Sequence, residues 1–154
     1  MALSVPLKPG QLSAEARSRI MRAIRSKDTK PELTVRRYLF NAGYRYRLHS
    51  KFLPGKPDLV FRRRRKIVLV HGCFWHQHPS ERCPIVGVPA SNKKYWGPKM
   101  KRNYTRDKAN LAALKELGFK VLVVWECELR MNPERALHKI RTFLGPPRWN
   151  APQA

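Results

Sequence analysis

The stretch "KIVLVHGCFWHQHPSERC", Lys66–Cys83, decides how this chain folds and where its chemistry lies. Its first part is apolar and rich in β-branched residues, which predicts a strand buried in the core. Its second part, from His71 onward, holds three of the chain's five histidines and two of its three cysteines, with Phe74 and Trp75 among them. A cluster of chemically active side chains therefore follows directly on the end of a core strand.

Helices and further strands are expected on both sides of this stretch. Ser13 is a suitable cap for a helix over 14–25. Asp28 or Thr29 can begin a second helix, which ends at Gly43. The other predicted elements are strands over 44–50, 57–61 and 119–127, a loop over 79–97, and helices over 99–117 and 133–144. This order predicts an α/β domain with a mixed central sheet flanked by helices.

The charge of the chain points to a polyanionic partner. Its 154 residues carry a net charge of +23, and 42% of them are hydrophobic, which is enough for one packed domain. Self-repulsion on this scale destabilises a compact chain, and binding to a polyanion would relieve it. Nucleic acid and an anionic membrane surface are the two candidates.

Neither the N-terminus nor the length of the apolar runs is typical of a membrane protein. No apolar run approaches the roughly 18 residues that span a bilayer. Pro6, Pro9 and Gly10 interrupt the short apolar start, so no signal peptide is expected. We therefore expect a cytoplasmic protein of the bacterial nucleoid that does not bind membranes. Its predicted parts are a flexible arm over 1–12, one domain over 13–145 and an irregular tail over 146–154.

The three cysteines cannot all pair with one another in one chain, and a cytosolic chain keeps its thiols reduced. Cys73, His78 and Cys83 follow one predicted strand closely, and Cys127 lies at the end of another. If the two strand ends are neighbours, these side chains form a Cys3His set, which is typical of a closed structural zinc site. The alternative is a set of ordinary buried thiols and a surface histidine.

Two histidines and two carboxylates are candidates for catalysis. A histidine side chain ordinarily titrates near neutrality, so either His71 or His76 could move protons in catalysis; two hydrogen-bonded structural histidines are the alternative. Asp58 follows a Pro-Gly turn at the start of a strand, and Glu32 lies in the first turn of a helix. A turn residue and a helix-terminal acid are the ordinary interpretations. In a basic groove, however, carboxylates could bind Mg²⁺ while a histidine activates water against a phosphodiester.

Three large aromatic residues are predicted to lie in loops rather than in the core: Phe74, Trp75 and Trp96. Apolar side chains of this kind can insert between base steps and unstack them. Packing around a zinc site is the alternative interpretation. The basic residues of the first helix could contact phosphates in either case.

The motifs "MRAIRSKDTKPE", "LPGKPDLVF", "VHGCFWHQH", "YW" and "VLVVWECEL" occur in this order from about 18 to 129. Together they resemble the very short patch repair (Vsr) endonuclease family. The resemblance implies a restriction-endonuclease-like fold and a Mg²⁺-dependent, strand-specific nick on the 5′ side of the T in a T:G mismatch. Such mismatches arise when 5-methylcytosine deaminates. It also implies a monomer that acts on double-stranded DNA, with mismatch-repair proteins as further partners.

The resemblance also assigns roles to individual residues. Asp58 would be the main Mg²⁺ ligand, helped by the backbone carbonyl of Val70. His76 would be the general base for the attacking water, and His71 would hold metal-bound water or the phosphate. Glu32 would order metal-bound water beside the N-terminal helices.

Further roles follow from the same motifs. Asp107 would orient a histidine, which we expect to be His76. The structural zinc ligands would be Cys73, His78, Cys83 and Cys127, and the DNA wedge would be Phe74, Trp75 and Trp96. The N-terminal helix would hold the DNA from the other groove.

One spacing differs from some relatives, in which the third zinc ligand comes two or three residues after the histidine. Cys83 comes five residues after His78, so the loop is longer here. Two alternatives to mismatch repair remain from the sequence. One is a related restriction-fold or homing-type nuclease without mismatch specificity, and the other is a non-catalytic, zinc-stabilised DNA-binding module.

Overall fold

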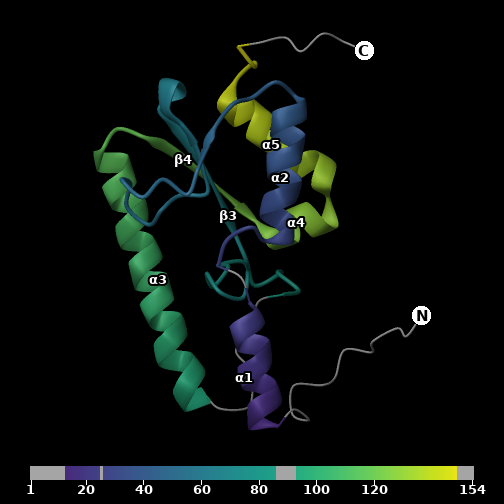
Figure 1. The fold of residues 1–154 in the computed structure, drawn as a ribbon, viewed down its shortest axis with the longest axis vertical. Coiled ribbons are helices and arrows are strands. Elements are labelled where there is room, and N and C mark those ends of the chain that lie inside the picture. The colour runs from purple at the N-terminus through teal and green to yellow at the C-terminus, as the bar shows by residue number, and fades with distance from the viewer. Residues whose placement is uncertain (1–12, 25, 86–92, 149–154) are drawn as a thin grey trace, which may run out of the picture.

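The computed structural model describes residues 13–24, 26–85 and 93–148 of the chain (Figure 1). The predicted arm over 1–12 and the end of the tail, 149–154, lie outside the described residues. In chain order the elements are α1 (Ala14–Ala23), α2 (Lys30–Asn41), β1 (Arg47–Leu48), β2 (Leu59–Phe61), the 3-10 turn η1 (Arg62–Arg64), β3 (Lys66–His71), α3 (Lys93–Glu116), β4 (Lys120–Trp125), α4 (Glu126–Met131) and α5 (Pro133–Leu144).

The four strands form one mixed sheet in the order β1-β2-β3-β4. β1 pairs with β2 and β2 with β3 in antiparallel fashion, whereas β3 and β4 are parallel. His71 at the end of β3 lies opposite Trp125 at the end of β4. The prediction of a mixed α/β sheet is confirmed. Because the two parallel strands end at the same edge, the segments that follow them start side by side.

Helices cover both faces of the sheet. On one face α2, α4 and α5 pack on Val68 and Val124, and this cluster holds most of the buried apolar side chains. On the other face Leu114 of α3 packs on Val60 and Ile67. Figure 1 shows the same three layers, with α3 on one side of the strands and α2, α4 and α5 on the opposite side. The central strands are therefore buried on both faces, which explains the nearly continuous apolar run in β3.

Local signals locate the two N-terminal helices. The side chain of Ser13 accepts a hydrogen bond from the backbone N–H of Ala16, and Thr29 does the same for Glu32. Side-chain oxygens at these positions satisfy N–H groups that have no partner within the helix. The predicted starts of both helices are confirmed. The first ends at Ala23, two residues before its expected end, and residue 25 lies outside the described residues.

The predicted loop over 79–97 is wrong in its last part. α3 already begins at Lys93, so Trp96 lies on a helix and not in a loop. Gly97 and Pro98 indicated a break, but the ring of Trp96 packs against Phe74 and Met100 is buried. Tertiary packing therefore overrides the local signal, as it often does.

Two other predicted boundaries also change. The strand expected over 44–50 is reduced to Arg47–Leu48, because Tyr44 instead packs in the core and donates its hydroxyl to the carbonyl of Gly145. The strand expected over 119–127 stops at Trp125. The next residues form α4, a short helix that the sequence did not predict, so Cys127 lies in a helix rather than at the end of a strand.

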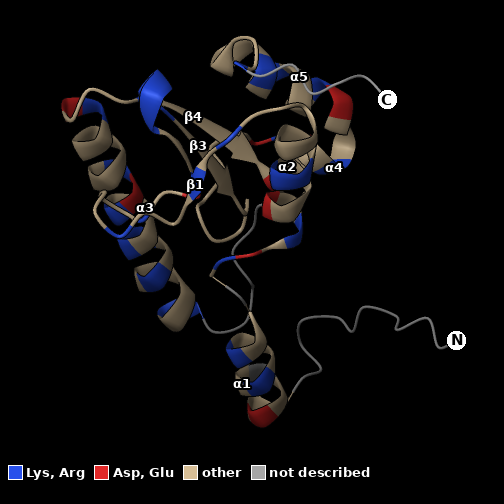
Figure 2. Ribbon diagram, turned by 45° about the horizontal axis from the view of Figure 1, so that its top comes forward, with Lys and Arg blue, Asp and Glu red and all other residues tan. Residues whose placement is uncertain are grey.

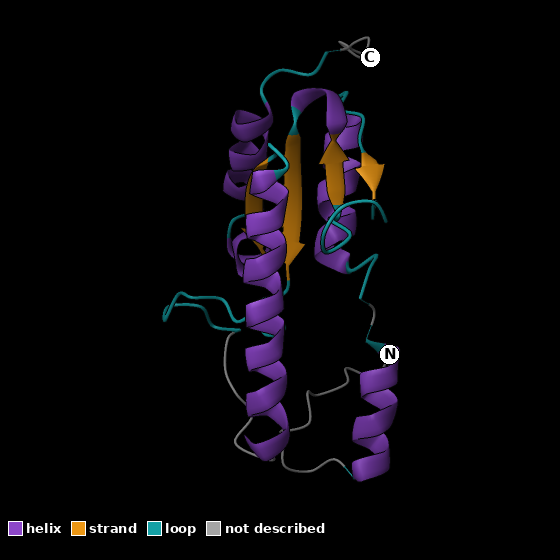
Figure 3. Cartoon of the chain, turned by 90° about the vertical axis from the view of Figure 1, so that its left-hand side faces the viewer, coloured by secondary structure: helices purple, strands orange, loops and turns teal. Residues whose placement is uncertain are grey.

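α1 stands apart from the sheet, at the end of the molecule where α3 begins (Figures 1 and 3). Ile20 and Ile24 in and after this helix are exposed. Figure 2 shows Lys and Arg along α1 and α3 and at η1, with far fewer acidic residues. Basic residues thus lie both on α1, which stands apart from the sheet, and along α3, which packs on it.

Candidate active site and metal centre

The candidate site forms where β3 and β4 end. The loop that follows β3 carries the histidine and cysteine cluster, and α4 follows β4 immediately. Two backbone hydrogen bonds shape the loop, from the N–H of His76 to the carbonyl of Gly72 and from His78 to Cys73. Gln77 has a positive φ of 49°, which turns the chain between these histidines. The loop thereby directs neighbouring side chains to different sides.

The cysteines and one histidine form a compact cluster. The ligand atoms of Cys73, His78, Cys83 and Cys127 all lie within 4.8 Å of one another. Cys127 Sγ is 3.6 Å from Nδ1 of His78, and the backbone N–H of Cys127 donates to Sγ of Cys73 over 3.3 Å. All three cysteines are buried. The set that the sequence singled out is therefore brought together, including Cys83 with its longer spacing.

This cluster is suited to a metal. Burial raises the pKa of the Cys73 thiol to about 12, so the thiolate form is unfavourable there without a compensating cation. A bound cation deprotonates coordinating thiols and removes that penalty. Three sulfur donors and one imidazole nitrogen are a donor set that zinc prefers.

Asp58 lies just before β2, opposite the end of β3. Its Oδ2 accepts a hydrogen bond from the backbone N–H of Val70 over 2.8 Å. Burial raises the pKa of Asp58 to about 6, and the nearby charge of Glu32 acts in the same direction. The hydrogen bond from Val70 and the charge of His76 oppose this shift only in part. A buried carboxyl with a pKa raised in this way is a candidate for a functional site, and a bound cation would favour its ionised form.

His71 and His76 lie face to face, with ring centroids 3.9 Å apart and ring planes 9° apart. Nδ1 of His76 is 2.5 Å from Oδ2 of Asp107, which comes from the middle of α3. Burial is the largest single effect and opposes ionisation of Asp107. The hydrogen bond to His76 and the charges of His76, His71 and Arg106 together outweigh it, so the pKa of Asp107 is lowered. Burial, followed by the charge of His76, lowers the pKa of His71 to about 4. His71 is therefore neutral at neutral pH.

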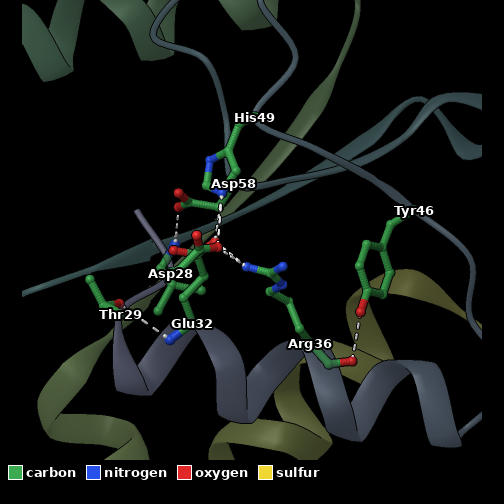
Figure 4. A network of polar contacts seen from close by, with 8 residues as sticks. Asp28, Thr29, Glu32, Arg36, Tyr46, His49 and Asp58 are labelled. Atoms are coloured by element: carbon green, nitrogen blue, oxygen red, sulfur yellow. Dashed lines mark hydrogen bonds and ion pairs between the residues drawn. The ribbon is translucent and has the colours of Figure 1, made fainter. Parts of the chain in front are cut away.

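Glu32 belongs to a polar network that the sequence only partly indicated (Figure 4). Its Oε1 lies 3.2 Å from Nη1 of Arg36 and 3.0 Å from Nε2 of His49. The same Nη1 of Arg36 lies 2.5 Å from Asp28. Glu32 is 2% exposed, and its charge acts on Asp58, so the network adjoins the Asp58 carboxyl.

His49 and Arg36 were missed at the level of sequence. The signal for His49 was the hairpin formed by the predicted strands over 44–50 and 57–61, which places His49 opposite Asp58. The backbone N–H of His49 indeed lies 3.4 Å from the carbonyl of Asp58. Arg36 gave no signal, since a basic residue on a helix of so basic a chain is ordinary.

The three aromatic residues also come together. Phe74 lies edge-on to Trp75 and Trp96, at centroid distances of 4.9 and 5.4 Å. The ammonium of Lys99 lies 5.5 Å from the ring centroid of Trp75. The side chains that pack on the three cysteines are instead Ile85 and Trp125. The aromatic group is therefore separate from the packing around the cysteine cluster. It joins the loop after β3 to the start of α3.

In the described part of the chain, no helix is both long and apolar enough to cross a bilayer.

The sequence of this chain is similar to those of known proteins. The family model described as DNA mismatch endonuclease Vsr matches residues 11–82. The chain is 50% identical over 119 residues to the type II nicking enzyme V.XorIIP of Xanthomonas oryzae pv. oryzae, covering 77% of this chain and 85% of that enzyme. It is 41% identical over 114 residues to the DNA mismatch endonuclease Vsr of Escherichia coli, covering 74% and 71%. The resemblance inferred from the motifs is confirmed: the chain belongs to the Vsr family and is a DNA endonuclease.

Proposed function

We propose that this endonuclease is Mg²⁺-dependent and strand-specific. It nicks on the 5′ side of the T in T:G mismatches that deamination of 5-methylcytosine leaves behind, as in very short patch repair. One observation carries the proposal. At one edge of the sheet, the buried Asp58 carboxyl lies within electrostatic reach of His76, which is paired with Asp107 and stacked on His71.

Asp58 and the backbone carbonyl of Val70 would hold the Mg²⁺ ion. When bound, the ion neutralises charge on the scissile phosphate. The N–H of the same Val70 already fixes the Asp58 carboxyl, so the hydrogen bond orients the ligand before a cation arrives. Burial makes Asp58 hard to ionise, and a cation beside it favours the ionised form.

His76 is the general base of this proposal. Nδ1 of His76 contacts Oδ2 of Asp107. Nε2 is therefore the ring nitrogen that can take the proton from the attacking water. Asp107 stays ionised and stabilises the imidazolium that results, because its own pKa is lowered. His71 is neutral and holds water or a phosphate oxygen by hydrogen bonding. Glu32 orders water from the α2 side.

We also propose that the Cys3His cluster holds structural zinc. The donor set uses all three cysteines and leaves no ligand position for a substrate, so its role is to fix the loop that carries His76. The ligands are Cys73, His78, Cys83 and Cys127. The cysteine cluster and the His76–Asp107 pair then secure the loop from two sides.

The wedge of the proposal is the aromatic group, which enters the duplex beside the mismatch. Its members are Phe74, Trp75 and Trp96. α1 carries basic residues and stands apart from the sheet (Figure 2). In this proposal it holds the DNA from the other groove. The core arrangement is restriction-endonuclease-like, and the chain acts as a monomer at the nucleoid, with mismatch-repair proteins as further partners.

The test uses a labelled duplex with one T:G mismatch in several sequence contexts and a matched C:G duplex. Each is incubated with Mg²⁺ and, separately, without any divalent cation. The expected result is a Mg²⁺-dependent nick 5′ of the mismatched T, absent from the C:G control. Equal nicking of both duplexes would contradict the mismatch role and leave a nuclease without that preference.

A further inference from the structure

We propose that His49 is a positioning residue that holds the Glu32 carboxylate at the Asp58 edge of the site. This inference rests on the part of the proposed function in which Glu32 orders water. It assigns a role to a histidine that the motif comparison left without one. It also explains how the Glu32 side chain of α2 is held at a fixed position relative to the hairpin that carries Asp58.

The first step is the burial of Glu32. Its side chain is almost inaccessible, and a buried carboxylate is costly unless it is paired. Two cationic or donor groups meet it, Arg36 at 3.2 Å and His49 at 3.0 Å (Figure 4). Arg36 lies one turn further along the same helix and also pairs with Asp28, so these two contacts of its side chain join Glu32 only to α2 and to the segment just before it. The contact with His49 joins Glu32 to a different element, because His49 lies just after β1.

The second step is the connection of His49 to Asp58. The backbone N–H of His49 lies 3.4 Å from the carbonyl of Asp58, next to the paired residues Leu48 and Leu59. His49 has a positive φ of 45°, which is a strained backbone conformation for a residue that has a Cβ. Such a conformation persists where the surroundings hold it, and here it turns the imidazole toward Glu32.

The third step concerns which atoms remain available. Among the contacts between described residues, Arg36 and His49 both approach Oε1 of Glu32. Oε2 is therefore the oxygen that can accept a hydrogen bond from water. Nε2 of His49 is buried, and although it is close to Oε1 it is not aligned as a hydrogen bond with any described residue. Site contacts of this kind commonly tighten when the substrate binds.

The experiment compares wild-type chain with His49→Ala, His49→Gln, Glu32→Gln and the double variant His49→Ala/Glu32→Gln. Single-turnover nicking rates are measured at saturating DNA and Mg²⁺, on whichever duplex the wild-type chain nicks, together with DNA affinity and thermal stability. His138→Ala is the matched control, because His138 lies on the exposed face of α5.

We expect His49→Ala to lower the nicking rate about 10- to 100-fold, as loss of a ligand-orienting partner does, with little change in DNA affinity. His49→Gln, which keeps an N–H donor, recovers a large part of the rate. In the Glu32→Gln background the same His49→Ala change has little further effect, because the residue it positions is already altered. His138→Ala nicks at the wild-type rate.

Three results would overturn the inference: a wild-type rate for His49→Ala, the same fold loss with and without Glu32→Gln, or a Glu32→Gln variant with the wild-type rate. A merely structural role would lower thermal stability and DNA affinity together, without rescue by glutamine. The proposed function is tested by a different measurement, namely which duplex the wild-type chain nicks and whether it needs Mg²⁺. Its failure can therefore be told apart from failure of this inference.

Discussion

Nδ1 of His76 lies 2.5 Å from Oδ2 of Asp107, although 31 positions of the chain separate the two residues. The contact joins the loop after β3 to the middle of α3 across the edge of the sheet. It selects which ring nitrogen of His76 remains available, and the stacked His71 ring then limits how the imidazole can turn. The imidazole that we propose as the proton acceptor is therefore oriented before substrate binds.

Asp107→Asn should therefore lower the single-turnover nicking rate by about 10²- to 10⁴-fold, the usual contribution of a positioned general base. Asparagine can still hydrogen-bond to His76, but it cannot stabilise the imidazolium. The rate is measured at saturating DNA and Mg²⁺. Glu116→Gln on the exposed end of the same helix is the control. An Asp107→Asn variant within a few-fold of wild type would remove Asp107 from the mechanism.

Asp58 should make the protein less stable as pH rises. Its pKa is raised from 3.8 to about 6 by burial, so the folded chain holds the proton more tightly than the unfolded chain. That contribution to stability is present below about pH 4 and lost as pH rises through about 6. Asp58→Asn abolishes nicking and, from pH 4 to pH 7, should gain up to about 3 kcal/mol in unfolding free energy relative to wild type.

The measurement is denaturant unfolding of both chains with zinc retained and no Mg²⁺ added. Addition of Mg²⁺ should narrow the gap at pH 7, because the cation binds ionised Asp58 in the wild-type chain only. Stability curves of wild type and Asp58→Asn that run parallel from pH 4 to pH 8 would contradict the raised pKa. DNA affinity of the variant stays close to wild type, since the positive surface is unchanged.

Much of this fold could be predicted, because its signals are local. Ser13 and Thr29 mark helix starts through their own hydrogen bonds, and the apolar run of β3 marks a strand buried on both faces. α3 could not be predicted in full, since the packing of Trp96 on the loop after β3 outweighs the Gly-Pro pair beside it. α4 is too short for periodicity to reveal.

The candidate site divides in the same way. The cysteine cluster could be predicted from residue type, because three buried thiols and a histidine have few other uses in one small domain. The predicted hairpin places His49 opposite Asp58, but the contact of His49 with Glu32 could not be predicted, because it depends on how α2 packs against that hairpin. A cluster of rare residue types, such as the cysteines, can be recognised in the sequence. A common residue such as His49 is recognised only from its partners in the folded structure.

The aromatic group should contribute to mismatch binding rather than to stability. Trp75→Ala should weaken binding to the T:G duplex by about 1–3 kcal/mol, the usual value of one base–aromatic stack. Binding to the matched duplex should change less, so the ratio of the two affinities falls. Tyr104→Ala is the control, since Tyr104 is an aromatic on α3 that is 47% exposed. An equal loss of affinity for both duplexes would contradict a role in mismatch binding and would show that Trp75 only packs against its aromatic neighbours.

The net charge of +23 should make DNA affinity steeply dependent on salt. Lysines and arginines that neutralise phosphates release counterions, so affinity falls by about 10³- to 10⁵-fold between about 50 and 200 mM salt if six to ten phosphates are contacted. Binding is measured by fluorescence anisotropy with Asp58→Asn, which does not cleave the probe. Affinity that hardly changes over this range would contradict a phosphate-dominated interface.

Loss of one ligand of the proposed zinc ion should be the most damaging single change to the fold. Zinc binding in small structural sites contributes about 10–16 kcal/mol of apparent free energy at neutral pH. Losing even part of this can exceed the whole unfolding free energy of one domain, which is about 5–15 kcal/mol. Cys127→Ser and Cys83→Ser should both lose bound zinc, measured by elemental analysis, and unfold at lower temperature. Ser80→Ala in the same loop is the control. Cys83 lies five residues after His78, and a Cys83→Ser variant that keeps its full zinc content would show that a solvent or another group completes the site.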